Sequence, residues 1–512
     1  MTSPAALLRL QSFIGGRFIA ARPAGAPRTI PDRNPSDPED VIAEAPAGDP
    51  ADAAAAVAAG VGALAAWRGA TGPERGEHLY RWAGAIAARQ EEIAQAMTRE
   101  VGKPIAEARG EAARCVAILR YYAGEAVRDV GEVIPAQAAG ALQFTLRQPL
   151  GVVALITPWN FPAAIPLWKA APALAFGNTV VLKPSEDAPH VATLLAETAA
   201  AAALPAGVFN VLLGDGPGAG EPLLREPAVA AVSFTGSAAV GARVAAAAAA
   251  RNLRYQTEMG GKNVAIVLAD ADLDLAAALT AGGAMRFAGQ KCTATSRVVV
   301  ARPVAEPFFA RLRAQVEKLP LGPVTDPAAA VGPLIRERSR RFVAEAVAAA
   351  CSGGGDGGER DGGGRGGSAS RHGARVVCGG PAPPADPRFA RGWFFTPTVL
   401  AEVPEDATVA REELFGPVLA AFEAADLDEA IAIANRTPYG LSATLFTRDL
   451  ASALTYVRRI EAGLVRVNGD TTGVDPHAPF GGVKGSSSGS REQGRAAREF
   501  FTEIKTVQIH PA

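Results

Sequence analysis

Two short polar stretches contain side chains that could carry out covalent chemistry. Cys292 lies in the polar break 289–297, between an apolar run expected to be helical (273–287) and a strand-like run (298–301). A break of this kind brings a side chain to the surface of a cleft. A cysteine is a nucleophile only as a thiolate, so it needs a cation, backbone N–H groups or a base nearby. Glu258 is a candidate base, because the glycines at 260–261 let the backbone approach a ligand closely.

Neither residue decides a function by itself. An isolated cysteine is more often a small buried apolar residue. An isolated glutamate is usually a solvated surface charge. The separation of 34 positions between Cys292 and Glu258 means that only the tertiary fold can bring them together.

The elements that must position these residues alternate between strand and helix from residue 151 onward. Such alternation predicts an α/β fold with a parallel sheet, in which ligands bind at the carboxyl ends of the strands. The polar breaks fall at those ends. Strands are expected at 152–156, 179–182, 208–213 and 229–234, and helices at 170–176, 191–203 and 238–250. Outside this region, helices are expected at 51–67, 72–100 and 104–123, an arm with short β-like runs at 12–43, and half-exposed strands at 142–147 and 501–507.

Composition excludes several function classes. A chain of 512 residues exceeds one ordinary core, so two or three domains are expected. A net charge of −1 gives no electrostatic reason to bind nucleic acid or an anionic membrane. The cysteines at 115, 292, 351 and 378 form neither a disulfide framework nor a zinc pattern, so we expect no metal site and a cytoplasmic location. No signal peptide is expected, and the alanine-rich run 51–66 is interpreted as a soluble helix.

Further segments relate the chain to a known family. The stretches 158–162 (Pro-Trp-Asn-Phe-Pro), 234–237 (Phe-Thr-Gly-Ser) and 412–418 (Glu-Glu-Leu-Phe-Gly-Pro-Val) join the Cys292 and Glu258 motifs in a fixed order. Over about residues 18–507 this pattern resembles the aldehyde dehydrogenase superfamily. The resemblance implies two α/β domains with parallel-sheet cores, one Rossmann-like and one catalytic, plus a small β oligomerisation flap. The implied division is 1–135 and 152–261 for the NAD(P)-binding domain, 262–470 for the catalytic domain, and 136–151 with 486–512 for the oligomerisation strands.

The resemblance also implies roles for individual residues. Cys292 would attack an aldehyde carbonyl and form a thiohemiacetal, while the Asn160 amide and the Cys292 backbone N–H stabilise the oxyanion. Loss of hydride to a nicotinamide would leave a thioester, for whose hydrolysis Glu258 would activate water. Lys183 completes the implied catalytic set and would also hold ribose hydroxyls. The implied cofactor-binding residues are Ile156, Thr157, Pro158, Trp159, Lys183, Ser185, Glu186, Gly216, Pro217, Thr235, Gly236, Ser237, Gly241, Glu413 and Phe415.

The cofactor is expected to be NAD, with NADP as the alternative. A carboxylate at Glu186 would accept hydrogen bonds from the adenosine ribose and repel a 2′-phosphate. Gly236 and Gly241 stand five apart, which departs from the usual dinucleotide fingerprint, but their place between a strand and a helix favours a phosphate at that helix N-terminus.

The resemblance within the superfamily points to a small aldehyde with a distal carboxylate as the substrate. It is strongest to α-ketoglutaric semialdehyde (2,5-dioxopentanoate) dehydrogenases, on stretches 118–125, 290–297 and 486–494. Arg286, six residues before Cys292, could bind such a carboxylate. The alternative interpretation of Arg286 is a surface or structural arginine. The succinic semialdehyde enzymes carry a second arginine where this chain has Trp168. The implied substrate-binding residues are Phe161, Trp168, Arg286, Lys291, Thr293 and Phe480.

Several alternatives stay open at this stage. Succinic or glutaric semialdehyde, or a broader range of aldehydes, could be the substrate. A CoA-acylating enzyme is disfavoured by Glu258, and a non-catalytic binding protein on the same fold is disfavoured by Cys292, Glu258 and Asn160 together. The exposed strands predict a homodimer or homotetramer. The run 352–371, rich in glycine, serine and arginine, predicts a flexible surface insertion.

Overall fold

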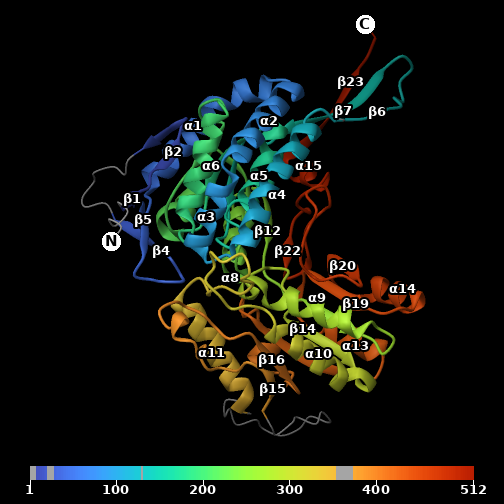
Figure 1. Ribbon diagram of the computed structural model, residues 1–512. Coiled ribbons are helices and arrows are strands. Elements are labelled where there is room, and N and C mark those ends of the chain that lie inside the picture. The colour runs from blue at the N-terminus through green and yellow to red at the C-terminus, as the bar shows by residue number, and fades with distance from the viewer. Residues whose placement is uncertain (1–6, 20–27, 129–130, 353–372, 512) are drawn as a thin grey trace, which may run out of the picture.

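The computed structural model describes residues 7–19, 28–128, 131–352 and 373–511. Two large sheets, each covered by helices, occupy the two halves of the molecule, and a narrow flap of strands projects from one end (Figure 1). The α/β architecture expected from the alternating pattern is therefore confirmed.

The first large sheet has eight strands in the order β22-β12-β11-β8-β9-β10-β2-β3. Its five central strands, β12 to β10, are parallel, whereas β22 on one side and β2 with β3 on the other pair antiparallel. Ile156 pairs with Lys183 and Thr235 pairs with Glu258, so the polar ends of four strands meet at one edge. The strands are β2 (Ser12–Ile14), β3 (Arg17–Ile19), β8 (Val152–Ile156), β9 (Thr179–Lys183), β10 (Phe209–Val211), β11 (Val229–Thr235), β12 (Arg254–Glu258) and β22 (Ser487–Ser488).

Alternation along the central strands gives this sheet two buried faces. Val153 and Leu155 point into a core with one group of helices, while Val152 and Ala154 point into a second core on the opposite face. The first core is covered by α2 (Gly72–Ala88), α3 (Gln90–Val101), α4 (Ile105–Glu125), α5 (Ala164–Ala175) and α6 (Pro189–Ala201). The second is covered by α1 (Pro50–Gly69), α7 (Glu221–Arg225) and α8 (Ala238–Ala249).

Two of the predicted helices differ from the structure. The single helix expected at 72–100 is two helices, because Arg89 leaves the helical conformation (φ −119°, ψ 19°). The helix expected at 170–176 starts earlier, at Ala164. Its first turn is stabilised from another helix, since the Glu111 carboxylate of α4 accepts hydrogen bonds from the N–H groups of Ala163 and Ala164.

Helix α1 is, among the described residues, the one helix whose length and composition would allow it to cross a membrane. It begins at an Asp49 cap, and Ala53, Ala56 and Val57 pack into the second core of the first sheet. One face of α1 thus packs into the protein core.

The second large sheet has seven strands in the order β15-β16-β17-β14-β13-β19-β20, parallel except at β15. They are β13 (Val264–Val267), β14 (Arg297–Ala301), β15 (Arg375–Cys378), β16 (Thr398–Ala401), β17 (Val418–Ala424), β19 (Ser442–Phe446) and β20 (Leu464–Val467). Around them lie α9 (Leu273–Met285), α10 (Ala305–Glu317), α11 (Glu337–Ser352), α12 (Thr408–Arg411), α13 (Leu427–Asn435) and α14 (Leu450–Arg459). The predicted insertion 352–371 lies outside the described residues, apart from Ser352, which ends α11.

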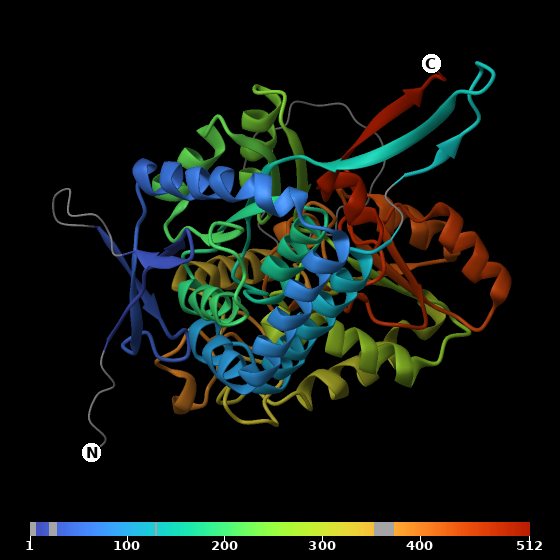
Figure 2. The same ribbon diagram turned by 90° about the horizontal axis from the view of Figure 1, so that it is seen from above.

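The projecting flap is a three-stranded sheet in the order β23-β7-β6. Strand β7 (Leu142–Pro149) pairs along its whole length with β23 (Thr502–Ile509), and β6 (Val133–Ile134) adds at the edge. Figure 2 shows β23 extending beside β7 away from the body of the molecule. Ile504 and Ile509 are exposed there, as expected for a surface that a second chain could cover. The oligomerisation role of the flap stays a prediction.

The predicted oligomerisation segment 486–512 contributes to more than one part of the fold. Only β23 belongs to the flap, because β22 pairs with β12 at the edge of the first sheet and α15 (Ala496–Phe501) packs against α5. The remaining strands form a three-stranded sheet of β1 (Leu8–Arg9), β5 (Val41–Pro46) and β4 (Thr29–Arg33), and the pair β18 (Tyr439–Gly440) and β21 (Val483–Lys484). The predicted domain division stays a prediction.

Candidate active site

Cys292 lies in a tight turn that follows α9. Phe287 and Ala288 have positive φ angles of 54° and 52°, and Gly289 follows with φ 66°. Left-handed backbone costs a residue with a side chain about 1 kcal/mol or more, so tertiary contacts must hold the turn. At Gly289 a Cβ would stand 2.4 Å from the Gly416 carbonyl oxygen, which requires glycine.

Hydrogen bonds connect this turn to the segment 333–335 and to Asn263, just before β13. The Gln290 side chain donates to the Pro333 carbonyl (3.0 Å) and accepts from the Ile335 N–H (2.9 Å). The Asn263 amide donates to the carbonyl oxygens of Cys292 and Ala294, both at 2.8 Å. Neither role was predicted, although the polar Asn263 directly before the buried strand β13 was a usable signal.

The Cys292 thiol is half-buried and needs assistance to ionise. Burial, together with the negative charges of the nearby Glu413 and Glu258 carboxylates, raises the pKa of Cys292 to about 12. The charge of the predicted base, Glu258, therefore acts on the predicted nucleophile, Cys292. At neutral pH the thiol is protonated, so a base or a bound positive charge has to favour the thiolate.

Asn160 lies beside the same turn, with 3% of its surface exposed. Its Nδ2 donates to the Gln290 carbonyl at 3.0 Å, two residues before Cys292. An amide nitrogen carries two hydrogens, so one donor is left for an oxygen bound at the sulfur. Asn160 therefore lies beside the Cys292 turn, and its role as an oxyanion donor stays a prediction.

A buried ion pair between Lys103 and Glu111, which the sequence analysis did not predict, holds the backbone of Asn160. Lys103 Nζ donates to the Asn160 carbonyl at 2.7 Å and forms an ion pair with Glu111. Both side chains are inaccessible to solvent, and Lys103 Nζ lies 3.9 Å from the centre of the Phe161 ring. Because Glu111 also binds the first N–H groups of α5, this pair fixes the whole segment that follows β8.

Glu258 ends β12 and is 1% exposed. Burial raises the pKa of Glu258 well above that of an ordinary glutamate, and the charge of Glu492 adds to this effect. Its Oε2 accepts a hydrogen bond from Ser487 (2.5 Å), whereas its Oε1 has no hydrogen-bond partner among the described residues. A buried carboxylate with one free oxygen is suited to accept a proton.

The edge of the first sheet has the donors that a dinucleotide would need. The hydroxyls of Thr157 and Thr235, after β8 and at the end of β11, are buried without a partner among the described residues. Ser237 precedes α8 without capping it by its side chain, so N–H groups of the first turn are free for a phosphate. A cleft of about 710 Å³, lined by Ser237, the first residues of α8 and Glu413, lies against this helix end, so the free N–H groups there fit a phosphate of a bound dinucleotide.

The glycines in this region permit close packing. A Cβ at Gly236 would stand 2.6 Å from the Phe234 ring, and one at Gly241 would stand 2.4 Å from Met259 Sδ. The close approach of Phe234 and Met259 thus accounts for glycine at both positions, whether or not they also approach a phosphate.

Lys183 and Glu186 are neighbours in space as well as in sequence. Lys183 Nζ lies 3.5 Å from Glu186 Oε2, and burial lowers the pKa of Lys183. Glu186 Oε1 also pairs with Arg336 at 3.1 Å, a contact that sequence analysis missed because Arg336 comes from the segment before α11. Gly216 and Pro217 start the short helical turn Gly216–Gly220 after β10, capped by Asp215. Ser185 is buried, and its hydroxyl accepts a hydrogen bond from the Asp187 N–H at 3.2 Å.

Glu413 and Phe415 are the residues predicted to bind the nicotinamide ribose. Its Oε1 accepts from the Gly261 N–H at 3.0 Å, and burial raises the pKa of Glu413 to about 7. Phe415, with φ 54°, packs edge-on against the Trp159 ring at 5.6 Å, just after Pro158.

The predicted substrate residues are only partly brought together. The rings of Trp168 and Phe480 lie 5.6 Å apart, and both are buried. Lys291 pairs with Glu107 at 2.8 Å, while the Thr293 carbonyl accepts from Thr471. In contrast, Arg286 is exposed at the C-cap of α9, so its contact with a substrate carboxylate stays a prediction.

Comparisons with known proteins cover nearly the whole chain. The model of the aldehyde dehydrogenase family matches residues 22–507. The α-ketoglutaric semialdehyde dehydrogenase of Bacillus subtilis is 41% identical, with 98% of each chain covered. The NADP-dependent succinate-semialdehyde dehydrogenase of Escherichia coli is 38% identical, again with 98% of each chain covered. Among solved structures, an NAD-dependent aldehyde dehydrogenase from Sinorhizobium meliloti superposes with a TM-score of 0.90 at 36% identity, covering 98% of this chain and 96% of that one.

Proposed function

Since the chain belongs to the aldehyde dehydrogenase family, we propose that it oxidises α-ketoglutaric semialdehyde to 2-oxoglutarate with NAD. The observation that carries the proposal is the cluster at Cys292. The Asn160 amide bonds to the carbonyl two residues before the thiol, and Glu258 is close enough for its charge to raise the thiol pKa. We assign these three groups as nucleophile, oxyanion donor and base, respectively Cys292, Asn160 and Glu258.

Cys292 is the proposed nucleophile. Once the thiol proton has passed to a base, the sulfur forms a bond to the aldehyde carbon, and the carbonyl electron pair moves to oxygen. The second Asn160 hydrogen and the Cys292 N–H would donate hydrogen bonds to that oxyanion. When bound, the nicotinamide supplies the hydride acceptor, and the carbon remains on sulfur as a thioester.

Glu258 is the proposed base for releasing the product. It takes a proton from water as the water oxygen bonds to the thioester carbon, and the carbon–sulfur bond then breaks to return the thiolate. The raised pKa of Glu258 makes its carboxylate a stronger base than a solvated glutamate. An enzyme with this base hydrolyses its thioester, which disfavours transfer to a CoA thiol.

The cofactor would lie along the strand ends of the first sheet. Lys183 and Glu186 would hold the adenosine ribose, the first turn of α8 a phosphate, and Glu413 with Phe415 the nicotinamide ribose. The carboxylate of Glu186 supports NAD over NADP, because it would repel a 2′-phosphate. NADP use is the alternative, since the named E. coli relative uses NADP.

The substrate proposal is supported by relatives with related names. Those at 41% and 39% identity are named for α-ketoglutaric or α-ketoglutarate semialdehyde, whereas others at 38% and 37% are named for succinate or glutarate semialdehyde. All these substrates carry a distal carboxylate, for which we propose Arg286 as the anchor. The flap and its exposed isoleucines favour a homodimer or homotetramer, and the four free cysteines favour a cytoplasmic location.

The testing experiment is a steady-state screen with NAD and NADP. Aldehydes of matched length with and without a distal carboxylate are compared by kcat/KM for NADH or NADPH formation. The highest value is expected for α-ketoglutaric semialdehyde with NAD. Equal values for succinic and α-ketoglutaric semialdehyde would remove the substrate proposal, and no turnover of any aldehyde would remove the enzymatic one.

A further inference from the structure

A strand of serines runs directly beside the proposed base. Strand β22 pairs antiparallel with the end of β12, so that Ser487 stands opposite Glu258 and Ser488 opposite Thr257. Each hydroxyl of this run has a partner on that side. Ser486 donates to the Gly260 carbonyl (2.9 Å), and the Ser488 hydroxyl bonds to the Thr257 hydroxyl (2.5 Å).

The Ser487 hydroxyl is oriented by a second contact. It accepts a hydrogen bond from the Gly482 N–H at 2.6 Å, and it lies 2.5 Å from Glu258 Oε2. A hydroxyl has one hydrogen, and the Gly482 contact uses only an oxygen lone pair. The hydrogen is therefore available to Glu258, and the backbone keeps it aimed there.

The two oxygens of Glu258 consequently have different surroundings. Oε2 is held by Ser487, while Oε1 is buried without a hydrogen-bond partner among the described residues. A Cβ at Gly481 (φ 147°) would stand only 2.9 Å from Oε1, so glycine there leaves room beside this oxygen. One oxygen is fixed, and the other is left for water.

We propose that Ser487 is a positioning residue that holds Glu258 as an ionised carboxylate with Oε1 directed at the water that hydrolyses the Cys292 thioester. This inference rests on the proposed function and deepens it. A hydroxyl donor stabilises the charged form of a carboxylate and has no such effect on its neutral form.

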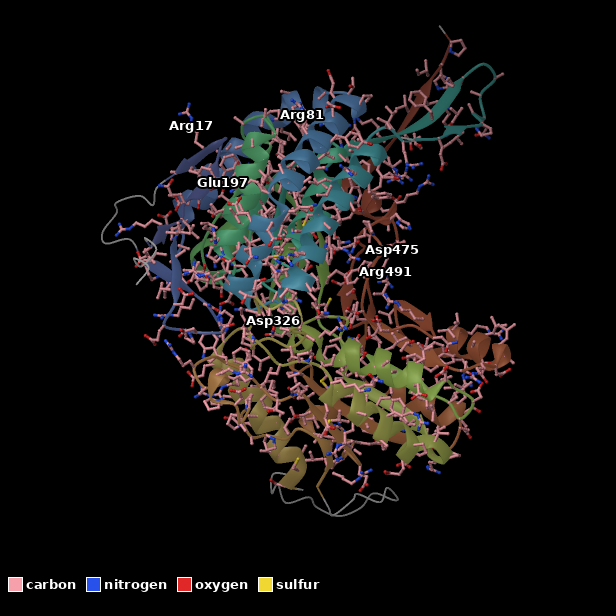
Figure 3. The ribbon with its side chains drawn as sticks, in the orientation of Figure 1. Arg17, Arg81, Glu197, Asp326, Asp475 and Arg491 are labelled. Carbon is pink, nitrogen blue, oxygen red and sulfur yellow. The ribbon has the colours of Figure 1, made fainter. Side chains whose placement is uncertain are left out.

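The electrostatics around Glu258 explain why such a donor is needed. Burial and the negative charge of Glu492 raise the pKa of Glu258, while the Ser487 hydrogen bond lowers it, followed by the positive charges of Lys169 and Arg491. Lys169 is itself paired with Glu492. Arg491 lies on the segment that joins the regions of the two large sheets (Figure 3) and donates to the Gly482 carbonyl. The charge of Glu258 also acts on the Cys292 thiol, whose pKa it raises.

The test isolates thioester hydrolysis from hydride transfer. p-Nitrophenyl acetate acylates Cys292, because the sulfur bonds to the acetyl carbon and nitrophenolate leaves with the ester oxygen. Hydrolysis of the acetyl thioester is then followed by intact mass against pH, for the full-length wild type, Ser487→Ala, Ser487→Thr and Ser488→Ala.

For Ser487→Ala, hydrolysis at neutral pH is expected to slow about tenfold, and the acid limb of the pH profile to move up by about one unit. Ser487→Thr keeps a hydroxyl and should restore the wild-type limb. The matched control Ser488→Ala loses a hydrogen bond to Thr257 but none to Glu258, and should leave the profile unmoved. If Ser487→Ala does not fold, Ser487→Cys, a weaker donor, should give a smaller shift in the same direction.

Two outcomes would overturn the inference. One is an unchanged pH limb in Ser487→Ala, or Ser487→Cys, with normal acylation. The other is an equal slowing without a shift in Ser487→Ala and Ser488→Ala, which would indicate a purely structural role. A wild type that neither forms nor hydrolyses the acetyl thioester would instead contradict the proposed function itself.

Discussion

The buried pair of Lys103 and Glu111 allows a strong prediction from the structure. The two side chains are 0% and 1% exposed, and the only other polar partner of the Lys103 ammonium among the described contacts is the Asn160 carbonyl. Glu111→Gln removes the charge but keeps one acceptor oxygen for the first N–H groups of α5. It leaves a buried cation without a counter-charge, which costs about 3–5 kcal/mol.

The loss should appear locally, in α4 and α5. Since each 1.4 kcal/mol is about tenfold in an equilibrium constant, protection from hydrogen exchange in these helices should fall by about 100-fold to 1000-fold or more. Aldehyde oxidation should fall as well, because the Asn160 backbone loses its anchor. Hydrogen exchange read by mass spectrometry suits this chain, whose 512 residues need not unfold in two states.

Two controls distinguish the cost of a buried unpaired charge from the loss of an ordinary side-chain contact. In Lys103→Met/Glu111→Gln no charge is left buried, so protection should recover a large part of the loss. On the same helix, Arg109 pairs with Glu91 at 2.8 Å, but both are exposed, and Glu91→Gln should change protection by less than about twofold. A change below threefold in Glu111→Gln, or no recovery in the double variant, would refute the explanation.

Three further predictions follow from the proposed site. Cys292→Ala should abolish aldehyde oxidation yet leave dinucleotide binding measurable by fluorescence titration, and residual turnover would mean that another residue is the nucleophile. Without cofactor, the rate of Cys292 alkylation by iodoacetamide, with Cys292→Ala as the blank, should rise about tenfold per pH unit from pH 7 to 9, because the thiol pKa is raised to about 12; a plateau below pH 9 would contradict that environment. Arg286→Ala should raise KM mainly for aldehydes with a distal carboxylate, and a uniform loss across all aldehydes in the same assay would count against its anchoring role.

Much of the fold could be predicted because it depends on local patterns. The strands β8, β9 and β11 are short apolar runs bounded by polar breaks, and the sequence spacing alone implied a parallel sheet. The break in the helix at Arg89 could not be predicted, because hydrophobic residues continue at helical spacing on both sides. The early start of α5 also escaped prediction, since its capping carboxylate, Glu111, belongs to another helix.

The sequence by itself determined the types of the reactive groups, their order and the places where strands end, since residue chemistry and apolar periodicity are local properties. Only the tertiary structure decided their environments. Burial and neighbouring carboxylates raise the pKa of Cys292, Lys103 anchors Asn160, and Ser487 faces Glu258 from more than 200 positions away. Electrostatic energies and hydrogen bonds depend on distance in space and on exclusion of water, neither of which is written in sequence spacing.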